Sequence, residues 1–118
     1  MQALYVAAGG AFGATCRFLL SYLPASDRGL PLSTFLANVI GCFLIGIIAV
    51  KGEARGWDEN VVLFLKTGFC GGLTTFSTFS AETMAMAQKG HMTTALFYVV
   101  ATVVTGFIAL YLGGQMVK

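Results

Sequence analysis

The chain has 118 residues and a mass of 12.4 kDa; 57% of its residues are hydrophobic and 10% are charged, whereas an ordinary soluble domain carries about 25% charged residues. So few charged side chains cannot cover the surface of a small soluble fold, and the mean hydropathy of +0.81 excludes a disordered chain. A net charge of +2 without a basic run argues against nucleic acid as a partner, and three cysteines without a CxxC pair argue against a disulfide scaffold.

Four windows are long and apolar enough to cross a bilayer core of about 30 Å, at residues 3–23, 32–50, 61–87 and 92–117. The connectors between them are short and polar, so adjacent spans must run antiparallel. We therefore expect an all-α integral membrane protein in which residues 1–118 form a single four-helix transmembrane domain. Because four such helices enclose little space, transport by this chain would need an oligomer.

The basic residues divide almost evenly between the two membrane faces. One side carries Lys51, Arg55, Lys66 and Lys118, and the other carries Arg17, Arg28 and Lys89. The positive-inside rule orients a membrane protein through such an asymmetry, so a difference of one residue gives the insertion machinery little reason to choose. A chain of this kind can insert both ways, although a bias of one or two charges is also able to fix one orientation.

Four polar side chains lie inside the first three spans. Arg17 and Lys66 are close enough to a span end to snorkel, and Arg17 and the shorter Glu82 are candidates for a water-filled vestibule. Asn38 lies deeper, in a span without charges, and lipid cannot satisfy its amide group. Asn38 therefore faces either water or another helix.

The third span is the most unusual part of the chain. Its centre, residues 68–80, holds three glycines and five hydroxyl residues in thirteen positions, which makes a poor helix interior. We expect a break at Gly71 and Gly72, whose freed carbonyls would suit a bound cation such as sodium. The alternative is a tilted, continuous helix that uses its glycines for packing.

Aromatic and hydroxyl side chains follow the expected break. Phe76 and Phe79 lie three residues apart, on one helix face, with hydroxyl residues between them. The edge of a phenylalanine ring is positive, so rings presented edge-on favour a small anion, although two aromatics at this spacing also suit core packing.

The fourth span carries a stripe of hydroxyls at Tyr98, Thr102 and Thr105, which suits either an ion pathway or contacts between helices. From the residues alone, the sequence indicates a small oligomeric membrane protein with a broken helix. Its spans carry hydrogen-bond donors, and no charged residue lies deep within a span. This combination weakly favours a small anion over a cation as the ligand.

Three stretches of the chain resemble a known family. They are GlyGlyAlaPheGly at 9–13 followed by Arg17, AsnValIleGly at 38–41, and GlyGlyLeuThrThrPheSerThrPheSer at 71–80 followed by Glu82. The last string is highly specific, and the similarity extends over the full length. On these motifs the chain resembles the Fluc (CrcB) family of fluoride channels.

The resemblance implies a fluoride-selective ion channel, not an enzyme, that is a multi-pass protein of the cell inner membrane and lets cytoplasmic fluoride leave passively down its electrochemical gradient. Family members are dual-topology homodimers, in which two identical subunits insert antiparallel and form two pores. The implied cofactor is a structural sodium ion at the dimer centre. The implied partners are fluoride, the lipid bilayer and the second subunit, with no nucleic acid.

The resemblance also assigns roles by position. Phe76 and Phe79 match the family's pore-lining phenylalanines, and Asn38 matches the second-helix asparagine of the pore. Gly71 and Thr74 match positions whose backbone carbonyls coordinate sodium. The remaining pore positions are Thr75, Ser77, Thr78, Tyr98 and Thr102.

Two further parts of the pattern concern the ends of the pore. Arg17 and Glu82 match vestibule residues near its mouths. On the fourth-helix polar track the position after Thr102 is Gly106, which has no hydroxyl. We expect Thr105 to substitute for it.

Two other kinds of membrane protein are alternatives. A small multidrug-resistance-type transporter is also a short four-helix chain, but it depends on a glutamate in its first helix, where this chain has only Arg17. A structural subunit of a larger membrane complex would need neither the phenylalanine pair nor the break. An enzyme is least expected, because the single histidine, His91, lies in a loop without an acid–base or metal constellation.

Overall fold

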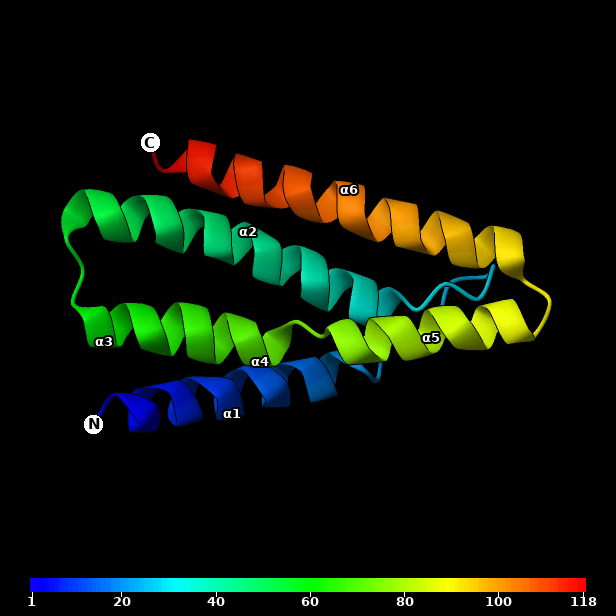
Figure 1. Cartoon of the computed structure of the whole chain (residues 1–118), viewed down its shortest axis with the longest axis horizontal. Helices are drawn as coiled ribbons and strands as arrows, with labels where there is room; N and C mark the ends of the chain where they lie inside the picture. Colours follow the sequence, from blue (N-terminus) through cyan, green and yellow to red (C-terminus); the bar gives the residue numbers. More distant parts are fainter.

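The computed structural model describes all 118 residues, and its helices lie along one long axis (Figure 1). Four segments are long and apolar enough to cross a membrane: α1 (Gln2–Leu20), α2 (Leu32–Arg55), the composite third span Glu59–Gln88, and α6 (Met92–Met116). The predicted set of four membrane helices is therefore confirmed.

Consecutive spans run antiparallel, as expected from their short connectors. In Figure 1, α6, α2, the third span and α1 lie one below another, and both chain termini are at the same end. As a result α2 and α6 run in the same direction side by side. Helix α2 continues to Arg55, beyond the apolar window at 32–50, and Gly56 ends it with a left-handed backbone, φ 61°.

Glycines bring α1 and the third span into direct backbone contact. Gly9 and Gly13 of α1 lie against the backbone of Phe64 and Phe69, and a Cβ at either glycine would collide with a carbonyl oxygen there. On the other helix, Gly68 and Gly72 lie against α1 in the same way. Each helix thus contributes a small-xxx-small pair to one close crossing, because only glycines allow backbones to approach this far in lipid.

A second close pair joins α2 and α6. Gly46 of α2 lies against the backbone of Leu110 and Gly114, and Gly113 of α6 lies against the carbonyl of Phe43. The monomer therefore consists of two tightly packed helix pairs, α1 with the first half of the third span and α2 with α6.

The third span is composite. It begins as the short helix α3 (Glu59–Val62), continues as the π-helical segment η1 (Leu63–Cys70) and the short turn α4 (Gly71–Leu73), and resumes as α5 (Phe76–Gln88). Between α4 and α5 the backbone is extended, with φ −84° and ψ 154° at Thr74 and φ −150° and ψ 120° at Thr75. The span is therefore broken near its centre, and a continuous helix is excluded.

The position of this break differs from the prediction. Gly71 and Gly72 remain helical, and the chain opens two residues later, at Thr74 and Thr75. Gly72 is used to approach α1, so it needs the helical backbone that places it there. Thr75 then starts α5 as its N-cap, because its Oγ1 accepts a hydrogen bond from the Thr78 N–H at 3.1 Å.

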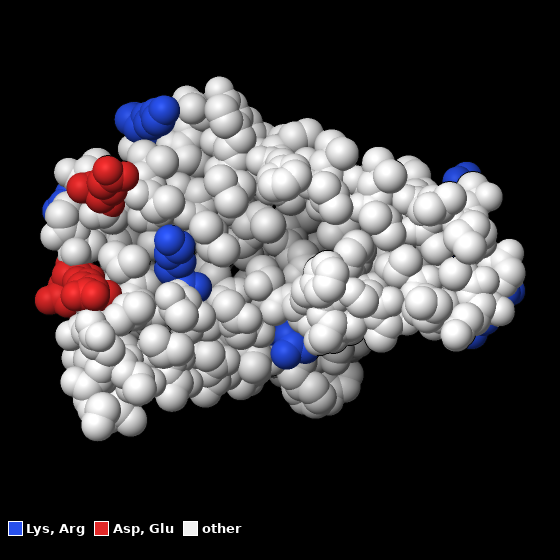
Figure 2. Space-filling model, in the orientation of Figure 1, with Lys and Arg blue, Asp and Glu red and all other residues white.

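Most of the surface is apolar. Only 17 of the 118 residues are buried, so the core of one chain is small and its large side chains face lipid or a partner. Figure 2 shows charged side chains mostly toward the two ends of the long axis. The charged side chains nearer the middle of this view are basic.

The glycine crossing predicts a sharp difference between two neighbouring positions of α1. Gly13→Ala would force a Cβ into the Phe69 carbonyl, whereas a Cβ at Gly10 would meet its nearest neighbour, the Gly68 oxygen, at an ordinary 3.8 Å. We expect Gly13→Ala to destabilise the protein by about 1–3 kcal/mol. Gly10→Ala is the matched control and should leave the melting temperature of the purified protein in detergent unchanged. Equal melting temperatures for the two variants would contradict this packing.

Candidate functional site

The break in the third span is held by a side chain of α2. The Asn38 Oδ1 accepts a hydrogen bond from the Thr75 N–H at 2.7 Å, and its Nδ2 donates to the Thr75 carbonyl at 3.2 Å. In a continuous helix the Thr75 N–H would donate to the Gly71 carbonyl. Of the two expectations for Asn38, the structure thus realises the contact with another helix, and the second amide hydrogen remains free.

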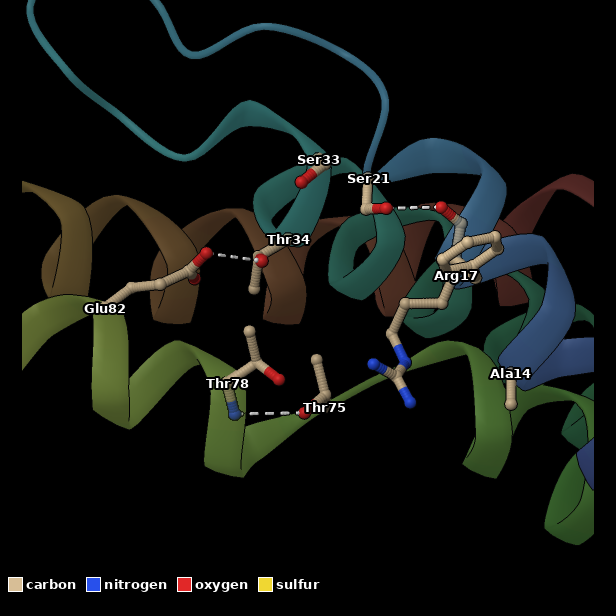
Figure 3. Close-up of a pocket in the computed structure, with 9 residues that line it drawn as sticks. Ala14, Arg17, Ser21, Ser33, Thr34, Thr75, Thr78 and Glu82 are labelled. Atoms are coloured by element: carbon tan, nitrogen blue, oxygen red, sulfur yellow. Dashed lines mark hydrogen bonds between the residues drawn. The ribbon is translucent and has the colours of Figure 1, made fainter.

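The guanidinium of Arg17 reaches the same break from α1. Its Nε donates to the Gly72 carbonyl at 3.1 Å, and Figure 3 shows the group pointing toward Thr75. Because the acceptor is a neutral carbonyl, the positive charge of Arg17 has no counter-charge in this contact.

Arg17 lines a polar hollow of about 350 Å³, which we name the Arg17 pocket. Helix α1, the start of α2 and the segment after the break all contribute to it (Figure 3). Its lining residues are Ala14, Arg17, Phe18, Ser21, Ser33, Thr34, Thr75, Thr78 and Glu82. One basic group, one carboxylate and several hydroxyls thus face a space wide enough for water and a small anion.

Glu82 is fixed at the wall of this pocket by two hydroxyls. Thr34 of α2 donates to its Oε2 and Tyr98 of α6 donates to its Oε1, each at 3.0 Å. Tyr98 is almost fully buried, so its hydroxyl depends on this contact. Sequence reasoning missed Thr34; the signal was its place four residues before Asn38, on the same face of α2.

A second hollow, of about 310 Å³, is lined by both Asn38 and Thr75, and we name it the Phe pocket. Its lining residues are Asn38, Cys42, Ile45, Thr74, Thr75, Phe76, Phe79, Thr102, Val103 and Gly106. Thr75 lines both hollows. The two pockets therefore meet at Thr75, a residue of the helix break.

The two phenylalanines of the Phe pocket are very differently buried. The Phe79 ring packs on Tyr98, with ring centroids 5.1 Å apart, and is buried. Phe76 lies 6.0 Å from Phe79 with the rings at 53°, and it is 79% exposed. The large Phe76 side chain at the mouth of the Phe pocket is thus left mostly uncovered by the rest of the chain.

Hydroxyls of α6 and α5 lie in different places. The Thr102 Oγ1 is buried and has no hydrogen-bond partner, which is costly unless a ligand supplies one. Thr105 does not join it: it lines an apolar hollow with Val39, Phe43 and Leu112, because a step of three residues turns the helix away from the Phe pocket. Ser77 is exposed and lines neither pocket.

Of the two residues predicted to hold sodium, Gly71 precedes the break and Thr74 lies within it. Gly71 is exposed, and nothing lies within 4 Å of the place a Cβ would take there. No hydrogen bond reaches the Thr74 carbonyl, since the Thr78 N–H donates to the hydroxyl of Thr75, the N-cap of α5. The Gly71 carbonyl loses its usual partner to Asn38. Carbonyl oxygens of this kind suit a hard cation.

Comparison with known proteins covers nearly the whole chain, including these segments. Residues 4–114 match the family described as "CrcB-like protein, Camphor Resistance (CrcB)". The chain belongs to the CrcB family. It is 42% identical over 116 residues to "Fluoride-specific ion channel FluC 2" of Rhodococcus jostii, with 98% of each chain covered.

Other relatives come from distant organisms. The chain is 41% identical over 111 residues to "Fluoride-specific ion channel FluC" of Azobacteroides pseudotrichonymphae, which covers 92% of this chain and 89% of the relative. It is 39% identical over 119 residues to the protein of the same name from Ignicoccus hospitalis, with 100% and 97% covered. The resemblance to this channel family is confirmed; the chain is a multi-pass membrane protein and not an enzyme.

The Glu82 contacts predict non-additive losses of stability. Tyr98→Phe keeps the ring packing and Thr34→Val keeps the side-chain shape, so each single variant removes one hydroxyl and should cost about 1 kcal/mol. The double variant should lose more stability than the two single variants together, because Glu82 then keeps neither hydrogen-bond donor. Double-mutant cycles on thermal unfolding measure this, with Tyr111→Phe as a control on an exposed tyrosine of α6. Strict additivity would contradict a shared carboxylate.

Proposed function

We propose that this chain is a fluoride-specific channel that lets the anion leave the cytoplasm passively, along the Arg17 pocket and the Phe pocket. The observation that carries the proposal is that Thr75, at the helix break, lines both pockets, one of which holds Arg17 and hydroxyls and the other Asn38, Thr102 and the two phenylalanines. Relatives at about 40% identity bear the name of fluoride-specific channels.

Fluoride is small and strongly hydrated, so a pore has to replace its water with donors and leave larger halides no room. Arg17 attracts anions at one end, and in the Phe pocket the free amide hydrogen of Asn38, the unpaired Thr102 hydroxyl and the ring edges serve as donors. No cation lines the Phe pocket. Each site is therefore weak enough for the ion to move on.

The direction of transport follows from acid–base chemistry. Fluoride enters a cell from acidic surroundings as neutral HF. The HF dissociates in the cytoplasm, where fluoride is trapped as the anion. An open pathway lets it leave down its electrochemical gradient without an energy source.

We further propose that the working unit is an antiparallel homodimer with two pores. Exposed Phe76 and Ser77 lie beside a pocket that one chain leaves uncovered, and a second copy would close it. The near-equal number of basic residues on the two membrane faces supports insertion in both directions, which an antiparallel pair requires.

A sodium ion at the dimer centre fits the break. The Thr74 carbonyl lacks a partner and Gly71 faces outward, so two such pairs of carbonyls from two subunits would coordinate one ion. The chain's own contribution is the extended backbone that Asn38 maintains. A melting temperature that is the same in sodium and in N-methylglucamine salts would contradict this site.

Fluoride efflux from liposomes that contain the purified protein tests the function, with chloride as the comparison ion. We expect fluoride to leave far faster than chloride, and Phe76→Ile or Phe79→Ile to lower fluoride efflux at least about tenfold while the oligomer survives. Met84→Ile, on an exposed α5 side chain away from the Phe pocket, is the control and should conduct normally. Equal fluoride and chloride fluxes would rule the assignment out.

Dual insertion is tested by labelling. A single cysteine is introduced next to Lys118, in a background without the native cysteines, and intact cells are treated with an impermeant thiol reagent. About half of the protein should react from outside, because half of the subunits place this end there. Complete labelling, or none, would contradict an antiparallel dimer.

A further inference from the structure

Helices α2 and α6 carry polar side chains in matching rows along the proposed fluoride route. They run in the same direction, so steps of four residues advance both by about 6 Å. In the first row Thr34 and Tyr98 meet at Glu82. In the second row Asn38 and Thr102 line the Phe pocket together. The next row along consists of Cys42 and Gly106, which line the same pocket.

In this third row only α2 supplies a side chain. The Cys42 Sγ lies 3.4 Å from the place a Cβ would take at Gly106, and no other atom of a neighbouring helix lies within 4 Å of that place. The thiol thus occupies the space that a larger residue of α6 would fill. Thr105, the expected replacement for a hydroxyl here, lies in a different hollow.

A second observation indicates that this part of the pocket receives a ligand. The Thr102 Oγ1, one row away on α6, is buried without any hydrogen-bond partner in the protein. A group that enters the Phe pocket, which Thr102 lines, would supply the missing partner.

We propose that the Cys42 thiol lines the fluoride pathway as the donor of its third row, and that it makes the pore a binding site for soft, thiophilic cations. The inference rests on the proposed function and deepens it. A thiol is a weak donor, so it passes fluoride on without holding it. A soft metal ion binds there far more firmly, because sulfur is its preferred ligand.

Silver is the probe. A silver ion replaces the thiol proton, which leaves to water as the sulfur–silver bond forms, with no electron transfer. The other two cysteines serve as internal references: Cys16 lies in a wholly apolar hollow between α1 and α2, and Cys70 is fully buried. Only Cys42 lines a pocket with polar groups.

The experiment measures fluoride efflux in nitrate medium before and after micromolar silver nitrate, and again after dithiothreitol. We expect silver to lower the efflux of the unmodified protein and of Cys16→Ser about tenfold or more, and dithiothreitol to restore it. Cys42→Ser should conduct and be insensitive to silver. Silver inhibition that persists in Cys42→Ser, or no inhibition of the unmodified protein, overturns the proposal.

Moving the donor to the other helix tests its role in conduction. Cys42→Ala should lower fluoride efflux about threefold, and the double variant Cys42→Ala/Gly106→Ser should recover it, because the new hydroxyl enters the space the thiol has left. Unchanged efflux in Cys42→Ala, with the oligomer intact by size-exclusion chromatography, rejects a role as donor. If the unmodified protein conducts no fluoride, the proposed function itself fails, which is a different result from either of these.

Discussion

Two hydrogen bonds between the side chain of Asn38 and the backbone of Thr75 hold the third span open. They replace the helical hydrogen bonds that the backbone between α4 and α5 would otherwise form. The freed carbonyls, the N-cap of α5 and the placement of Phe76 and Phe79 all depend on this opening. One amide of α2 thus maintains the break beside which the proposed anion route and the candidate cation site both lie.

The glycines have a different task from the break. Gly9, Gly13, Gly68 and Gly72 bring α1 against the third span so closely that Arg17 reaches the Gly72 carbonyl just before the chain opens. The positive charge of Arg17 therefore lies beside the break, in the Arg17 pocket, where the proposed function has it attract an anion from water. The Phe pocket has no charged lining residue, and in the proposed function this keeps anion binding weak.

Helix number, direction and the presence of a break could be predicted from the sequence, because hydropathy, short connectors and the run of glycines and hydroxyls are local signals. The exact partners of the break could not. Gly72 stays helical because its close approach to α1 requires that backbone, and Thr34 joins the site through a hydrogen bond to Glu82 of α5, a contact between helices that no local signal gives. Thr105 was expected beside Thr102, but three residues of helical rotation place it elsewhere.

The central claim is that fluoride passes beside a break that Asn38 maintains. The most direct test is the fluoride efflux of Asn38→Leu in liposomes, compared with Thr105→Val as a control on α6 outside the route. The account predicts that Asn38→Leu still forms the oligomer but conducts fluoride at least about tenfold more slowly, while Thr105→Val conducts normally. Efflux through Asn38→Leu at the rate of the unmodified protein would contradict it.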